Sequence, residues 1–345
     1  NKAALDHSIK LSYLDDTYIM REYLSSSPEA SCKVLKNYEY NCTESQHITH
    51  KIHKTGTLMS VIALNDDDQT IIDLRDFVND EGILEWTVPQ GNWNIEEYVC
   101  EQDISSNFID ILDYNISSKY IKETFGVLLE KLSKDNSNCM IDTFIFRNIM
   151  FAGENRRMWN ERFNEIFEEE YGFDPAVYYP LLFRSFQGSA DKYKCMLMSC
   201  RAKMLYEGYL KAASEFCLSK DIFCTGFPAE GKATASSWLF GDGQMLHKYS
   251  SAPGISMPFA YLYGINGIKV AAGAADALGS DTVVADMFNH FSYLSRDIIY
   301  RESMNAYVRG VNMILTHLGK DVVENSTEIT EKKEDTLGQP FSEED

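Results

Sequence analysis

The chain has 345 residues, and 44% of them are hydrophobic, so it can bury a sizeable core and is not disordered as a whole. Its 32 basic and 52 acidic residues give a net charge of −20. This acidity argues against nucleic-acid and anionic-membrane partners, because phosphate contacts need a basic surface. It is compatible with a neutral partner such as a carbohydrate. The oligomeric state is left open.

The cysteines and the hydropathy bear on the compartment. No run of about 18 apolar residues occurs, so we expect no membrane span. The eight cysteines form no CxxC pair, which argues against a zinc or redox motif. A chain of this length needs no disulfide staples, so free thiols and a cytoplasmic location are expected.

The first third of the chain predicts extended structure. Residues 1–56 are mixed and polar. A continuous apolar run predicts a strand at 57–64, and a shorter strand is expected at 70–74. Partial alternation of apolar and polar side chains predicts two extended segments within 84–100. Residues 57–100 are therefore expected to be rich in β-structure.

Helices and strands alternate after about residue 116. The predicted helices are 117–132, 155–171, 175–186, 190–218, 267–278 and 293–308, and the predicted strands are 140–146, 221–226, 282–285 and 311–315. This alternation indicates parallel βα units, and the length suits a (β/α)8 TIM-like barrel, possibly irregular. We expect one such barrel over 57–318, with the β-rich portion as an insertion and an acidic, mobile tail at 319–345.

Candidate catalytic groups follow from the rule that active sites of parallel α/β folds lie at the C-terminal ends of strands. Glu230 and Asp286 each follow a predicted strand, and glycoside hydrolysis needs such a carboxyl pair. Each acid also has a structural interpretation, since Glu230 could face solvent on a loop and Asp286 could cap a helix. The candidate substrate-binding residues at the same edge are Asn148, Asn289, His290, Asn312 and His317.

Three histidines recur at every third position as His47, His50 and His53. Helical spacing would bring them roughly onto one face, where a metal site is conceivable. No acidic or cysteine residue in that stretch completes a ligand set, so no metal site is predicted there.

Several short stretches, in the same order, resemble large bacterial α-L-rhamnosidase-like glycoside hydrolases, glycoside hydrolase family 106 and its relatives. The stretches are WTVPQGNW at 86–93, NFIDILD at 107–113, the segment from Trp159 through YGFD at 171–174 to YPLLF at 179–183, SSAPGI at 250–255, and RGVNMILTH at 309–317. The resemblance implies a TIM-like barrel that hydrolyses rhamnosides or related glycosides with a carboxylate pair. It also implies that a divalent cation, calcium in this family, assists.

Carried onto this sequence, the resemblance matches Glu230 and Asp286 to the acidic positions and His317 to a histidine of the last strand. There are two departures. Relatives often carry an acid after the strand at 140–146, where this chain has Arg147 and Asn148, and they carry Glu where this chain has Asp286. Two alternatives therefore stay open beside an active glycosidase: a carbohydrate-binding relative without catalysis, and a structural or interaction protein with an eroded pocket.

Overall fold

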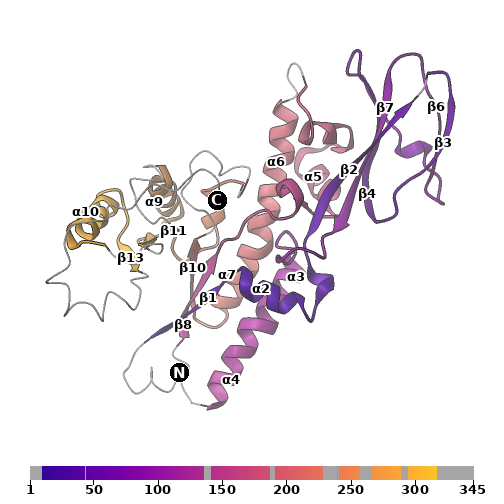
Figure 1. Cartoon of the computed structure of the whole chain (residues 1–345). Coiled ribbons are helices and arrows are strands. Elements are labelled where there is room, and N and C mark those ends of the chain that lie inside the picture. Colours follow the sequence, from indigo (N-terminus) through magenta and orange to yellow (C-terminus); the bar gives the residue numbers. More distant parts are fainter. Residues whose placement is uncertain are drawn as a thin grey trace, which may run out of the picture.

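A computed structural model describes residues 10–42, 44–135, 141–186, 191–227, 239, 241–256, 266–288 and 294–316 (Figure 1). An antiparallel sheet lies at one end of the molecule, and a small parallel sheet with two helices lies at the other, with long helices between them. The predicted tail at 319–345 lies outside the described residues. No helix within the described ranges is long and apolar enough to cross a membrane.

The antiparallel sheet has five strands in the order β5-β4-β7-β2-β9. A second antiparallel pair, β3 with β6, packs its apolar side chains against this sheet around Trp86 and Trp93. The strands predicted at 57–64, at 70–74 and within 84–100 are confirmed. The bounds of the seven strands are Lys33–Cys42 (β2), His47–Lys51 (β3), Gly56–Asn65 (β4), Ile71–Asp73 (β5), Ile83–Thr87 (β6), Trp93–Gln102 (β7) and Met158–Trp159 (β9).

Parallel strands make up two further sheets of three strands each. The first has the order β1-β8-β10 and the second β11-β12-β13, and an isolated parallel bridge between Thr225 and Ala252 links them. The bounds are Leu11–Asp15 (β1), Ile141–Arg147 (β8), Phe223–Phe227 (β10), Gly254–Ser256 (β11), Val284–Met287 (β12) and Met313–Thr316 (β13).

The expected (β/α)8 barrel is wrong for the described part of the chain. The first parallel strand, β1, is followed by the antiparallel strands β2 to β7 before the parallel pattern resumes at β8. The βα alternation of the C-terminal part was predicted from local periodicity, which identifies parallel strands but does not fix how many close into one sheet. The described parallel strands remain in two sheets of three.

The helices cover the parallel strands and join them to the antiparallel sheet (Figure 1). Apolar side chains at helical spacing explain most of them, and the largest buried cluster runs from Tyr120 and Phe125 to Trp159 and Tyr209. The bounds are Thr17–Leu24 (α2), Tyr114–Ile121 (α3), Val127–Asp135 (α4), Phe163–Tyr171 (α5), Asp191–Leu205 (α6), Lys211–Leu218 (α7), Asn266–Leu278 (α9) and Arg296–Tyr307 (α10).

Two predicted helices differ in detail. The helix expected at 155–171 begins only at Phe163, because Met158 and Trp159 pair with β2 as strand β9. It ends at Tyr171 as predicted, and Gly172 caps it in the left-handed conformation, with φ of 77°, which favours a residue without a Cβ. The helix expected at 175–186 is a 3-10 helix over Ala176–Leu182.

Candidate functional site

Asp286 is the buried acid around which the candidate site is built. It lies within β12, and its side chain is 1% exposed. The other residues of this strand are apolar and buried: Val284, Ala285 and Met287. A carboxylate in such surroundings requires polar partners, because desolvating a charge is costly. Two of its partners, Arg147 and Ser256, come from other parallel strands.

The first partner is Arg147, the last residue of β8. Its Nη2 lies 3.5 Å from Oδ2 of Asp286, and the Arg147 side chain keeps 22% of its surface exposed. The second is Ser256 at the end of β11, whose hydroxyl donates to the same oxygen at 3.3 Å. Three parallel strands thus direct polar side chains to one point near their C-terminal ends.

The backbone directly after two of these strands is strained. Asn148 follows β8 with φ of 57°, and Phe288 follows β12 with φ of 66°. Left-handed φ is uncommon for residues other than glycine and an outlier for a bulky residue such as Phe288. Such strain clusters at functional sites, where the surroundings hold it in place. Both strained positions adjoin the polar residues of the candidate site.

Close strand packing next to the site depends on glycine. A Cβ added to Gly226 in β10 would lie 2.3 Å from the carbonyl oxygen of Phe146 in β8. A Cβ on Gly254 in β11 would lie 2.5 Å from the carbonyl oxygen of Gly226. The strands that carry Arg147 and Ser256 can therefore approach β10 only because these positions have no side chain.

The predicted site residues divide into three groups. Asp286 and the position of Asn148 next to Arg147 belong to the edge described above. The side chain of Asn312 accepts a hydrogen bond from Val283 N at 2.8 Å and donates to Asp281 O at 2.6 Å, which ties it to the start of β12, away from Asp286. The remaining predicted residues lie outside the described ranges: Glu230, Asn289, His290 and His317.

Sequence reasoning did not assign Arg147 and Ser256 to the site. The resemblance to glycoside hydrolases predicts an acid after the strand at 140–146, and the structure shows there the guanidinium of Arg147, which contacts Asp286. Ser256 directly follows the SSAPGI stretch, so its position at a strand end was a usable signal.

A second acid stands at a strand end but on the other face of the sheet. Asp15 is the last residue of β1 and pairs in register with Phe146, so it points away from the Arg147 face. It is 1% exposed and accepts hydrogen bonds from the hydroxyls of Tyr120, at 2.5 Å, and Tyr209. Burial raises its pKa to about 7, although both tyrosine hydrogen bonds lower it. Its contacts with the helices make it a core residue.

The calcium ion implied by the family resemblance does not fit the described residues around Asp286. A guanidinium occupies the position beside Oδ2, and Ser256 supplies a single hydroxyl. Calcium takes six to eight oxygen ligands in typical sites. Across the residues the structure describes, no group of three or more His, Cys, Asp or Glu is arranged to hold a metal ion.

The histidine stretch takes a different structure from the helix that its spacing suggested. His47 and His50 lie on strand β3, and His53 lies just beyond it. Nε2 of His50 lies 2.6 Å from Oε1 of Glu97 and Nδ1 of His53 lies 3.1 Å from Oε2, so both rings share one buried carboxylate.

Comparison with known proteins finds similarity in structure alone. No family model matches the chain, and no curated protein matches it. Among solved structures, a rhamnosidase from Novosphingobium sp. PP1Y is similar with a TM-score of 0.56 and 18% sequence identity. The match covers 75% of this chain and 26% of that chain, so this chain spans about a quarter of the rhamnosidase's length. At this identity the likeness shows a shared fold.

Proposed function

We propose that this chain is a glycoside hydrolase-like protein that acts on a rhamnoside or a related glycoside. The observation that carries the proposal is Asp286, a buried carboxylate near the end of a parallel strand where Arg147 and Ser256 converge on it. The similarity of fold to a solved rhamnosidase supports it. A carboxylate pair is the machinery that most glycosidases use.

In this proposal Asp286 acts as the carboxylate that activates water or attacks the sugar, because its ion pair with Arg147 suits a charged group. Glu230 is the proposed proton donor to the leaving oxygen, since it follows the last residue of β10, Phe227, by three positions. Asn148, Asn289, His290 and His317 are the proposed contacts to sugar hydroxyls. Asn312 has no part in it, because its side chain is committed to the backbone.

Hydrolysis of an aryl α-L-rhamnoside tests the proposal. Asp286→Asn and Glu230→Gln should each lower the turnover rate by at least about 100-fold, the usual contribution of positioned acid–base catalysis. Asp276→Asn is the control, because Asp276 is an exposed acid on α9. Unchanged turnover in Asp286→Asn, with the wild type active, would refute the assignment.

A second candidate function is carbohydrate binding without catalysis. The observation that favours it is Arg147 itself, a cation at the strand end where relatives carry an acid, held against Asp286. Titration calorimetry with L-rhamnose separates the two functions. Saturable binding that is weakened by Asp286→Asn, together with no turnover of any aryl glycoside, would support the binding protein and exclude the enzyme.

A further inference from the structure

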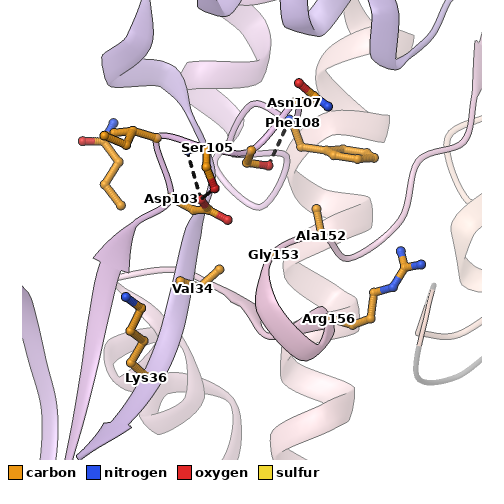
Figure 2. Close-up of a pocket in the computed structure, with 12 residues that line it drawn as sticks. Val34, Lys36, Asp103, Ser105, Asn107, Phe108, Ala152, Gly153 and Arg156 are labelled. Carbon is orange, nitrogen blue, oxygen red and sulfur yellow. Dashed lines mark hydrogen bonds between the residues drawn. The ribbon is translucent and has the colours of Figure 1, made fainter.

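A pocket of about 640 Å³ lies away from Asp286 and shares none of that site's residues. Its walls come from the start of β2, from the loop after β7 and from the loop after β8 (Figure 2). The volume lies within the usual range for small-molecule sites. Its lining residues are Val34, Lys36, Gln102, Asp103, Ile104, Ser105, Ser106, Asn107, Phe108, Ala152, Gly153 and Arg156.

The floor of this pocket, which we call the β2 pocket, is built tightly. Val34 and Ala152 are buried there, at 3% and 6% exposure. A Cβ on Gly153 would lie 2.1 Å from Cγ1 of Val34, so this position excludes any side chain and keeps the loop close to β2. The floor is an apolar surface against which the C–H face of a ring can pack.

Arg156 supplies a cation at the rim of the β2 pocket. Its Nη1 contacts Met150 Sδ at 2.9 Å and Phe151 O at 3.5 Å, and no carboxylate among the described residues pairs with it. Its backbone has a left-handed φ of 58°, and the buried Arg201 donates to its carbonyl oxygen at 3.0 Å. A core residue thus holds the backbone of Arg156 in place, and the remaining N–H groups of its exposed guanidinium pair with no carboxylate that the structure describes.

The other polar groups of the β2 pocket suit hydroxyls. Oδ1 of Asp103 already accepts from Ser105 N at 3.1 Å and from its hydroxyl at 2.6 Å, which leaves Oδ2 to accept from a ligand. The Asn107 side chain makes no hydrogen bond within the described part of the chain, and Figure 2 shows it on the loop opposite Gly153 and Arg156. Amide and carboxylate groups of this kind bind sugar hydroxyls in both donor and acceptor directions.

We propose that the β2 pocket binds a small polyhydroxylated carboxylate, the chemistry of an acidic sugar. Arg156 pairs with the ligand carboxylate, because the planar guanidinium matches that group with two parallel N–H donors. Lys36, at the opposite wall, is already paired, since its Nζ lies 3.0 Å from Oε2 of Glu101, so Arg156 is the cation that the proposal uses. A guanidinium that pairs with no described carboxylate favours an anionic ligand over a neutral one.

Titration calorimetry with D-glucuronate and D-glucose on the full chain tests this site. We expect glucuronate to bind more tightly than glucose, and Arg156→Gln to weaken glucuronate binding at least about tenfold, as loss of a charged hydrogen-bond pair does. Asn107→Ala should weaken it about threefold, in line with one neutral hydrogen bond. Arg21→Gln is the matched control, since Arg21 is an exposed arginine of α2.

Three outcomes would overturn the proposal: equal binding of glucose and glucuronate, wild-type affinity in Arg156→Gln, or no saturable binding of glucuronate. The comparison of the two sugars uses the wild type, so it decides the matter even where a variant fails to fold. Asp286→Asn should bind glucuronate as the wild type does, which separates this site from the proposed catalytic one.

Discussion

Replacing Asp15 by asparagine should change how the stability of this protein depends on pH. Asp15 is enclosed between β1 and the helices, where Tyr120 and Tyr209 donate to it. Burial raises the pKa of its carboxyl from 3.8 to about 7. Between these two values the native state binds a proton that the unfolded state releases, so the free energy of unfolding falls as pH rises through this window.

The size of the effect follows from the two pKa values. Below the unfolded-state pKa, the ionisation of Asp15 does not change the free energy of unfolding. Above pH 7 it lowers the free energy of unfolding by about 4 kcal/mol, and about 3 kcal/mol of this loss develops between pH 5 and pH 8. Asp15→Asn carries no charge at any pH and so removes this dependence. Asparagine still offers one oxygen to a tyrosine hydroxyl, at the cost of about one hydrogen bond.

Urea unfolding at fixed pH values measures this difference. Asp15→Asn should be about as stable as the wild type at pH 5, because the lost hydrogen bond offsets the penalty of about 1 kcal/mol that the wild type already carries there. At pH 8 it should be more stable by about 3 kcal/mol. Asp276→Asn, on exposed α9, should run parallel to the wild type. If the gap between wild type and Asp15→Asn stays constant from pH 5 to pH 8, burial does not raise this pKa and the reasoning is refuted.

Three further predictions concern buried contacts. Arg147→Gln should lower the free energy of unfolding, measured in urea, by about 2–4 kcal/mol, and Asp286→Asn by about 1 kcal/mol. The reason is that Arg147→Gln leaves the buried charge of Asp286 behind, whereas Asp286→Asn leaves the charge of Arg147, which is 22% exposed. Equal costs of the two substitutions would contradict this. Gly226→Ala should lower the melting temperature by several degrees, as overpacking does, since the new Cβ would meet the carbonyl of Phe146 at 2.3 Å. An unchanged melting temperature would show that the strands can shift. Glu97→Gln should cost about 1–3 kcal/mol of unfolding free energy, because two histidine rings share its buried carboxylate, and a cost near zero would show that water replaces it.

The helices and strands from β4 to β13 could be predicted mostly from local periodicity. The helical segment that runs from α3 through a π-helical turn into α4 is an example, since Tyr120, Ile121 and Phe125 recur at helical spacing and are all buried. Strand β2 was not predicted. Only Val34 and Leu35 of its ten residues are buried, and the strand is held by pairing with β7 and β9.

The candidate site could be predicted only in part for a similar reason. Asp286 was found because an acid at a strand end is a local signal. The contact with Arg147 joins β8 to β12 across almost 140 positions of sequence, and its formation depends on how the two parallel sheets meet. No pattern within either strand encodes that distance.

The tryptophans of the motifs behind the family resemblance pack in the core and do not line the candidate site. Trp86 and Trp93 of the first motif are buried and meet edge to face at a centroid distance of 5.9 Å between β6 and β7. Trp159 of the third motif is buried too, and its indole N–H donates to Tyr179 Oη at 3.2 Å. Residues with such packing roles can be retained in any protein that keeps this architecture, whatever its activity. In this chain these motif residues therefore have packing roles, and the question of catalysis rests on Asp286 and its partners.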